Sequence, residues 1–329
     1  MAGDTVIDEP VDRHAVARFV AQRYGPSAAE SVAELGGGDW SRAFSFRLDR
    51  RDLVVRLGRH LEDFTKDQKA AMAFAGPGLP VPTVLEIGEA APGLFYAVSE
   101  RHFGVFLETL DERGWRNLLP ALLRALDALR EVQPPGSGVD WASGEGVTAP
   151  VNSVGWQQWL VASLEDRPGG RVSGWRARLK ETQGIEEVFV SGQQALRSLL
   201  GACPDVRHVL HRDLLNRNVL VADDATGLAA LFDWGCSVAG DFLYEVAWLT
   251  FWAPWYPALA AIDFCRVIQD HHRTIGLRVE DFDQRLACYE LHIGLEHLAY
   301  AAFTGRAEDL HAVARRTVQI LEPISKGSN

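Results

Sequence analysis

The most informative segment of the chain reads His208-Val-Leu-His-Arg-Asp213-Leu-Leu-Asn-Arg-Asn218-Val-Leu-Val221, and Phe232-Asp233-Trp234-Gly235 follows it after an apolar run. The apolar residues on both sides of the first segment predict short buried strands. Asp213 and Asn218 then lie in the loop between two strands, and Asp233 lies in a turn at the end of a third. We therefore expect these polar side chains to face one cleft.

This pair of segments matches the H-R-D-L-x-x-x-N and D-x-G motifs of kinases. Phosphoryl transfer needs a divalent metal held by an amide oxygen and a carboxylate, and a separate carboxylate that accepts the proton of the acceptor hydroxyl. Asp213 is the predicted base, and Asn218 and Asp233 are the predicted Mg²⁺ ligands. The alternative is a pair of ordinary turns rich in Asn and Asp, but the offset of Asn218 and the flanking strands favour catalysis.

The composition indicates a soluble globular protein. The 329 residues include 33 Lys and Arg against 44 Asp and Glu, a net charge of −11, and 47% are hydrophobic. These values exclude a disordered, collagen-like or disulfide-scaffold chain, and the length suggests two lobes with a cleft between them. The acidic balance argues against nucleic-acid and membrane partners and permits a cationic substrate, although solubility alone would explain it. We expect a monomer.

Targeting and metal-binding patterns are missing from the sequence. Residues 1–10 carry acids where a signal peptide needs a basic flank, and no apolar run has bilayer length, so we expect a cytoplasmic protein. The four cysteines show neither a C-x-x-C spacing nor paired histidines, so we expect them to be reduced. Asp270-His271-His272 lacks a third ligand at a suitable spacing, and we expect no structural zinc.

The expected fold class is α+β, a bilobal protein-kinase-like fold with a small antiparallel sheet lobe and a mainly helical lobe. We place the first lobe at 1–99, the hinge at 100–104 and the second lobe at 105–329. In the first lobe Asp12 is expected to cap a helix. The other expected elements of this lobe are strands at 44–48, 53–57, 84–87 and 94–98 and a helix over 65–75.

The second lobe is expected to begin with a long amphipathic helix. Six leucines between 118 and 129 recur at helical spacing, and helical patterns dominate the rest of the chain. Residues 133–155 and 166–174 are rich in Pro, Gly and Ser, which predicts two surface loops.

The first lobe contains a segment that fits nucleotide phosphates. Gly36-Gly37-Gly38 and Ser41 lie between strands, where backbone N–H groups can cover phosphates, although three glycines are more often a plain turn. Strand alternation places Val54 against the adenine and points Arg56 at the phosphates, where kinases carry a lysine.

Two further contacts to the nucleotide are predicted. The partner of Arg56 is expected to be Asp67 of the following helix, since a short acid suits a long, forked guanidinium. By itself such a pair is more often a surface salt bridge. The backbones of Glu100 and His102, in the segment that joins the lobes, are expected to read the adenine.

Several longer segments are recognisable, namely Ser41-Arg-Ala-Phe-Ser-Phe46, Leu79-Pro-Val-Pro-Thr-Val-Leu-Glu-Ile-Gly-Glu89, Cys203-Pro-Asp-Val-Arg-His208, Gly240-Asp241 with Tyr244-Glu245-Val-Ala247, and Phe251-Trp-Ala-Pro-Trp255. With them the sequence resembles the aminoglycoside phosphotransferase family. The resemblance covers most of the chain but is poor over 133–190, and Arg212 departs from the small residue usual before the base. It implies a protein-kinase-like fold and transfer of the γ-phosphate of ATP or GTP to a hydroxyl of an aminocyclitol antibiotic, with hygromycin B the expected acceptor.

A small acceptor is favoured over a peptide independently of this resemblance. Only residues 234–240 separate the D-x-G motif from the Gly240-Asp241 turn, and no A-P-E motif follows, so a peptide-docking activation loop is missing. Asp241 is expected to bond to the backbone of the catalytic loop or to His211 in that loop, and it can at the same time cap the helix that runs through Trp248.

The predicted acceptor site combines aromatic and acidic side chains. Trp252, Trp255 and Tyr256 offer rigid walls for an aminocyclitol ring or its ammonium groups, although core packing is an equally good explanation. The resemblance implies that Glu290 and Glu296, on a C-terminal helix, bind amines. Exposed helix acids are otherwise simply solvated.

Two other classes of function stay open. A metabolite kinase for a choline, amino-acid or sugar acceptor would use the same machinery, because a fold does not fix a function. A catalytically silent nucleotide-binding scaffold would be expected to have lost the base or a metal ligand. The presence of Asp213, Asn218 and Asp233 together argues against the silent scaffold.

Overall fold

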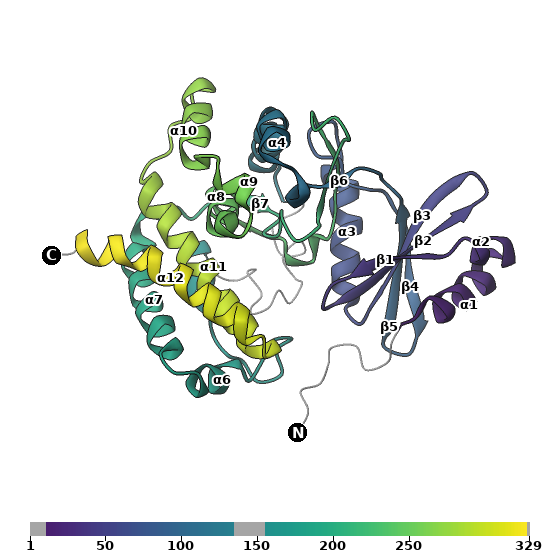
Figure 1. Ribbon diagram of the computed structural model, residues 1–329, viewed down its shortest axis with the longest axis horizontal. Helices are drawn as coiled ribbons and strands as arrows, with labels where there is room; N and C mark the ends of the chain where they lie inside the picture. The colour runs from purple at the N-terminus through teal and green to yellow at the C-terminus, as the bar shows by residue number, and fades with distance from the viewer. Residues whose placement is uncertain (1–10, 135–154, 328–329) are drawn as a thin grey trace.

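The computed structural model describes residues 11–134 and 155–327, and its amino-terminal lobe is built on one antiparallel sheet (Figure 1). The strands lie in the order β1-β2-β3-β5-β4. They cover Ala33–Gly37 (β1), Ser41–Leu48 (β2), Arg51–Gly58 (β3), Val84–Ala91 (β4) and Leu94–Glu100 (β5). The four strands predicted for this lobe are present, and β1 is an additional edge strand.

One face of the sheet is buried by α1 (Arg13–Tyr24) and α2 (Pro26–Glu30). Side chains alternate between the two faces of a strand. In β3 the positions buried with these helices are Leu53, Val55 and Leu57. Val54 and Arg56 therefore lie on the opposite face of the sheet.

The start of α1 agrees with the sequence prediction, whereas the start of α3 does not. Asp12 caps α1 as predicted, since its Oδ1 accepts from the Ala15 N–H at 2.7 Å. Helix α3 (Leu61–Phe74) begins four residues before the predicted start at Thr65. The Thr65 hydroxyl donates to the Leu61 carbonyl at 3.0 Å, so it lies inside the helix instead of capping it.

Helix α3 lies between the sheet and the second lobe (Figure 1). Its Ala70 and Phe74 belong to the apolar core of that lobe, where they pack with residues of α4 (Glu112–Glu131). The helix therefore packs against β4 and β5 of its own lobe and also against the second lobe.

The second lobe is mainly helical. After α4 the helices are α5 (Trp156–Ala162), α6 (Trp175–Glu181), α7 (Ile185–Leu199), α8 (Leu243–Trp252), α9 (Pro257–Ala260), α10 (Phe264–Thr274), α11 (Phe282–Thr304) and α12 (Ala307–Gly327). Helix α11 is buried on most of its surface and contacts α6, α7, α8 and α12. Since α11 passes through the centre of the lobe, its side chains can reach the segment that carries Asp213.

Short strands frame that segment. They are β6 (Val105–Phe106), β7 (His208–Leu210), β8 (Val219–Val221), β9 (Leu228–Leu231) and β10 (Val238–Gly240). The chain enters the second lobe at Gly104, whose φ is +153°. A Cβ atom there would lie 2.3 Å from the Val221 carbonyl oxygen, so only glycine allows β6 to pair with β8.

The predicted α+β architecture is confirmed. The long amphipathic helix is α4, and 166–174 form a loop as predicted, whereas most of the predicted loop at 133–155 lies outside the described residues. Across 11–134 and 155–327, every helix is too short or too polar to cross a bilayer. All four cysteines are free thiols.

Candidate active site

Strand pairing brings Asp213, Asn218 and Asp233 together. β8 and β9 are antiparallel neighbours, and their ladder continues one step further because the Phe232 N–H donates to the Asn218 carbonyl at 3.1 Å. Asn218 and Asp233 therefore leave adjacent strand ends. Asp213 precedes them in the loop that connects β7 to β8, as the sequence predicts.

Asp213 is held by two amides. Its Oδ1 accepts from Asn216 Nδ2 at 2.7 Å and its Oδ2 from Asn218 Nδ2 at 2.8 Å. Burial raises the pKa of the Asp213 carboxyl to about 7, and the charges of Asp233 and Glu108 act in the same direction against the two amides. A fixed carboxylate with a pKa near neutrality is suited to accept a hydroxyl proton.

The backbone of this loop is unusual. Arg212, Asn216 and Arg217 have φ values of +65°, +58° and +67°, and Asp233 has a φ of +65°. Non-glycine residues adopt this left-handed conformation infrequently, and such residues cluster at functional sites. Glu108, just after the segment that joins the lobes, supports the loop by accepting from the Arg217 N–H.

Asn218 and Asp233 fit a divalent cation. The Asn218 amide nitrogen donates to the carboxylate of Asp213 and also to its carbonyl, at 2.9 Å, which leaves the amide oxygen to face a cation. The Asp233 side chain is 44% exposed. Mg²⁺ usually takes one or two such oxygens from the protein and the rest from phosphates and water. In the described part of the chain no three His, Cys, Asp or Glu side chains form a metal cluster of their own.

The predicted Arg56–Asp67 ion pair is present between β3 and α3. The second carboxylate oxygen of Asp67 accepts from the Trp234 N–H at 2.7 Å, and an Arg56 nitrogen lies 3.6 Å from Asp233 Oδ1. The guanidinium can donate in two directions at once because of its planar fork. It therefore connects acids of both lobes at the position where we expect phosphates.

Lys66 is a site residue that the sequence reasoning missed. It is 4% exposed, and its Nζ donates to the carbonyls of Gly235 and Ser237 at 2.7 and 3.1 Å. Burial lowers its pKa to about 8. Lys66 and Asp67 together fasten α3 to the Asp233-Trp234-Gly235 turn. The signal in the sequence is a second charged residue next to the predicted partner of Arg56.

The glycine segment forms the hairpin turn between β1 and β2. The Gly38 N–H donates to the Ser41 carbonyl at 3.1 Å. A Cβ atom on Gly37 would lie 2.7 Å from the same carbonyl oxygen, so the tight turn requires glycine there. This geometry is compatible with the predicted phosphate contacts of Gly36-Gly37-Gly38 and Ser41, which stay a prediction.

The residues predicted to contact the adenine of the nucleotide lie along β3 and at the end of β5. Val54 shares a face with Arg56, as the alternation predicts. Glu100 is the last residue of β5, and the His102 ring nitrogen Nδ1 bonds to the Ala229 carbonyl at 2.9 Å. The His102 side chain thereby fixes the crossing segment to the second lobe, and its backbone role with adenine stays a prediction.

Comparison with known proteins identifies this arrangement. A family model described as "Phosphotransferase enzyme family" matches residues 31–277, which include the glycine hairpin, Arg56, and the loop that carries Asp213. The chain belongs to this phosphotransferase family. A hygromycin-B 4-O-kinase of Escherichia coli is 30% identical over 299 residues, which are 89% of this chain and 81% of that relative.

Solved structures agree with this assignment. A thermostable mutant of the aminoglycoside phosphotransferase APH(4)-Ia, in a ternary complex with AMP-PNP and hygromycin B, is 27% identical with a TM-score of 0.76, over 93% of this chain and 98% of that one. APH(2")-IIIa, in a complex with GDP and kanamycin, is 15% identical with a TM-score of 0.61, over 97% and 100% of the chains, and shares the fold. The resemblance to aminoglycoside phosphotransferases is thus confirmed.

Two of the aromatic residues expected at the acceptor site, Trp252 and Trp255, are in ring contact with each other. The Trp252 and Trp255 ring centroids lie 4.9 Å apart, and Trp255 is 37% exposed. Burial raises the pKa of the Tyr256 hydroxyl, and the nearby charges of Glu108 and of the predicted catalytic base Asp213 add to this effect. Tyr256 is therefore near the catalytic loop, and the acceptor contacts of the three aromatic residues stay a prediction.

The expectation that Glu290 and Glu296 bind amines is corrected by their contacts. Glu290 lies 3.1 Å from a nitrogen of Arg316 on α12, which joins two helices of the core. Glu296 is 8% exposed and is paired with Arg212. Both acids lie on α11, which is buried and not an exposed amphipathic helix, and each already has a cationic partner.

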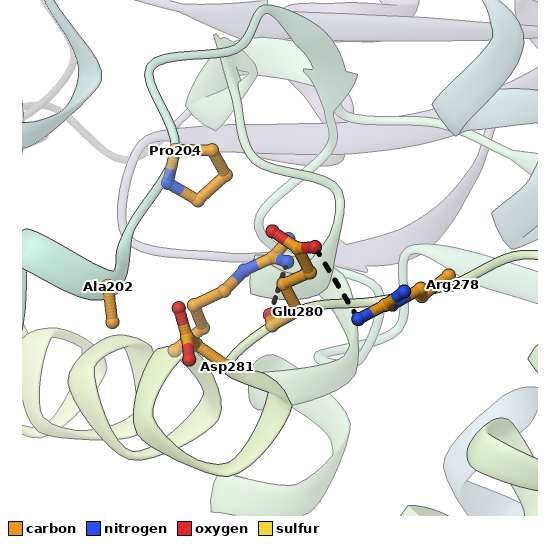
Figure 2. Close-up of a pocket in the computed structure, with 6 residues that line it drawn as sticks. Ala202, Pro204, Arg278, Glu280 and Asp281 are labelled. Carbon is orange, nitrogen blue, oxygen red and sulfur yellow. Dashed lines mark hydrogen bonds and ion pairs between the residues drawn. The ribbon is translucent and has the colours of Figure 1, made fainter.

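Asp241 also differs from its prediction. It accepts from the Leu243 N–H at 3.3 Å, as expected, but its other partners are Arg285 at 2.7 Å and the Tyr289 hydroxyl at 2.5 Å, not His211. Arg285 borders a separate cavity of about 310 Å³ beside the start of α11. Figure 2 shows this cavity, whose lining residues are Ala202, Pro204, Arg278, Glu280, Asp281 and Arg285. It contains none of the residues assigned to phosphoryl transfer.

Proposed function

We propose that this chain transfers the γ-phosphate of ATP or GTP to the 4-hydroxyl group of hygromycin B, a cationic aminocyclitol antibiotic. The observation that carries the proposal is the meeting of Asp213, Asn218 and Asp233 at the ends of β7, β8 and β9, with Arg56 reaching Asp233 from the other lobe. The relative named for hygromycin-B 4-O-kinase activity supports the choice of acceptor and hydroxyl.

The base and the charged groups divide the chemistry between them. Asp213 orients the acceptor hydroxyl and receives its proton as the oxygen attacks the γ-phosphorus, while the bond from that phosphorus to the bridging oxygen breaks and the nucleoside diphosphate leaves. Asn218 and Asp233 would hold Mg²⁺, which when bound neutralises charge on the phosphate oxygens. Arg56 adds a fixed positive charge close to the same oxygens. Because the transition state needs little covalent help, positioning and these charges supply most of the catalysis.

The nucleotide lies under the glycine hairpin in this proposal. The backbone N–H groups of residues 36–41 face its phosphates, and Val54 packs against its base. We place the hinge at 100–104, between the end of β5 and the start of β6. In this proposal the backbones of Glu100 and His102 form hydrogen bonds with the adenine. Trp252, Trp255 and Tyr256 form the wall against the aminocyclitol ring.

Nucleotide consumption by the purified chain tests the proposal. The assay contains Mg²⁺ with hygromycin B, with other aminoglycosides, or with small metabolite alcohols as acceptors. We expect strong stimulation by hygromycin B and a product with one phosphate on the 4-hydroxyl, identified by mass spectrometry and NMR. Stimulation by a metabolite alcohol alone would replace the proposal with a metabolite kinase. Nucleotide binding without transfer to any acceptor would indicate a silent scaffold.

A further inference from the structure

We propose that Arg212 and Glu296 form a buried ion pair that positions the catalytic base, so that both residues act on the reaction through Asp213 without touching a substrate. This inference rests on the proposed function, because it assigns a role to the residue directly before the base.

Arg212 makes contacts with four separate parts of the second lobe. It is 7% exposed, and its Nη2 is paired with the Glu296 carboxylate of α11. Its Nη1 donates to the Cys236 carbonyl at 3.4 Å, just after the Asp233-Trp234-Gly235 turn. Its Cζ lies over the Trp159 ring of α5 at 4.5 Å and the Tyr244 ring of α8 at 5.4 Å.

Glu296 belongs to a hydrogen-bonded chain that is buried throughout. The Tyr244 hydroxyl donates to the Glu296 carboxylate at 3.4 Å and lies 2.9 Å from His292 Nδ1. The other ring nitrogen of His292 lies 2.6 Å from the Ser163 hydroxyl. The carboxylate therefore has a fixed position set by α8, α11 and the end of α5, and it presents a fixed acceptor to Arg212.

Stability alone does not explain a charged pair at this place. Replacing a buried ion pair with apolar side chains of similar volume is often neutral or stabilising, because desolvation offsets the attraction. What a guanidinium adds is direction, since its planar fork donates to two acceptors at fixed angles. Here those acceptors are on α11 and on the segment that carries Asp233.

The backbone of Arg212 links the orientation of its side chain to the position of Asp213. Arg212 has a φ of +65°, and its N–H donates to the Glu245 carboxylate at 2.9 Å. Arg212 has a left-handed backbone conformation and is held both at the tip of its side chain and at its backbone N–H, so the peptide that leads to Asp213 is fixed. The carboxylate of Asp213 is thereby aligned with the segment that carries the metal ligand Asp233.

A cycle of variants separates positioning from stability. Arg212→Met leaves Glu296 as an unpaired buried carboxylate, so we expect a lower Tm and a kcat reduced by about tenfold to a hundredfold. Glu296→Leu leaves the guanidinium unpaired, with the same expectation. In Arg212→Met/Glu296→Leu neither member of the pair is left charged without its partner, and we expect the Tm to recover while kcat stays low and both KM values stay within about threefold of wild type.

Recovery of kcat together with the Tm in the double variant would show a purely structural pair and overturn the proposal, as would single variants with wild-type kcat. Arg316→Gln serves as the matched control, because it removes another arginine paired with a glutamate of α11. We expect it to lower the Tm and leave kcat unchanged.

Crystal structures of the wild type and the double variant give a readout that needs no acceptor. We expect the Asp213 carboxylate of the double variant to leave at least one of its contacts with Asn216 and Asn218. An unchanged loop would overturn the positioning role even if the wild type phosphorylated no antibiotic. Absence of transfer by the wild type, with the loop displaced in the variant, would overturn the proposed function and not the positioning.

Discussion

At the scale of single residues, Asp213 is distinguished by its two carboxylate oxygens, which both accept from side-chain amides of its own loop. Asp213→Asn keeps the shape of the side chain but removes the proton acceptor. We expect turnover to fall by about a thousandfold, within the range for loss of a general base. Nucleotide affinity should stay within about threefold of wild type, because Asp213 holds neither the phosphates nor the metal. Steady-state kinetics and calorimetry with AMP-PNP measure the two quantities.

Asp223→Asn is the control for this substitution, since Asp223 is exposed and lies between β8 and β9. Its turnover should equal that of the wild type. An Asp213→Asn enzyme that retained more than a tenth of wild-type turnover would mean that another group accepts the proton.

Arg56 and Asp67 give a second prediction at the residue scale, which concerns side-chain length. A lysine at position 56 donates as a point charge and lacks the fork that reaches both Asp67 and Asp233. We expect Arg56→Lys to raise the nucleotide KM about tenfold. Adding Asp67→Glu lengthens the acid and should restore much of the loss. If the double variant is no better than the single one, the two residues do not act as a length-matched pair.

At the scale of elements, three residues on one side of α3 attach this helix to the second lobe. Asp63 accepts from Arg171 at 2.6 and 3.0 Å, Lys66 donates to the carbonyls of Gly235 and Ser237, and Asp67 accepts from the Trp234 N–H. Together these contacts hold the helix that orients Arg56, and they do so without any bound nucleotide.

Lys66 makes this attachment dependent on pH. Burial lowers its pKa in the folded chain to about 8, from 10.5 as the ordinary value. Between these two values the unfolded chain binds more protons than the folded one, so the contribution of Lys66 to stability increases as pH rises. We expect the free energy of unfolding of the wild type, minus that of Lys66→Met, to grow by about 2 kcal/mol from pH 8 to about pH 10.

Denaturant unfolding of the two proteins at each pH measures this difference. The contributions of other titrating groups cancel because both proteins contain them. Lys180→Met is the control, because the Lys180 side chain is 59% exposed, and the corresponding difference should stay flat. A wild-type advantage that shrinks above pH 8 would show that the protonated ammonium is the form that the fold prefers.

The sequence predicted those elements whose signals are local. The loop with Asp213 and Asn218 was predictable because apolar strands flank it, and Val54 and Arg56 because strand alternation is a short-range rule. Buried charges escaped prediction for the opposite reason. Glu296 lies in a largely apolar stretch of its helix, Leu291–Phe303, but only the position of α11 at the centre of the lobe shows that it is paired with Arg212.

At the scale of the whole molecule, the two lobes are joined at a further place, besides the segment that crosses between them and the contacts of α3. Asp39, next to the glycine turn, accepts from the Tyr300 hydroxyl and is paired with Arg306, close to the end of α11. Trp40 lies under the Arg171 guanidinium, with 4.1 Å from its ring centroid to Cζ. The hairpin predicted to cover the phosphates is therefore attached to the helical lobe.

This attachment should control how fast nucleotide leaves. Tyr300→Phe/Arg306→Gln removes both partners of Asp39, and loss of two such contacts is expected to raise the nucleotide dissociation rate about tenfold in a stopped-flow displacement assay. Hydrogen exchange at residues 36–41 should increase with it. The Tm should change little, because Arg306 and Asp39 are 46% and 31% exposed and such pairs add little stability. Arg266→Gln, which removes an ion pair of a side chain that is 79% exposed, should change none of these quantities. If hydrogen exchange increases while nucleotide dissociation stays at the wild-type rate, the hairpin moves without releasing nucleotide. In that case Arg56 and the metal ligands bind the phosphates without help from the hairpin.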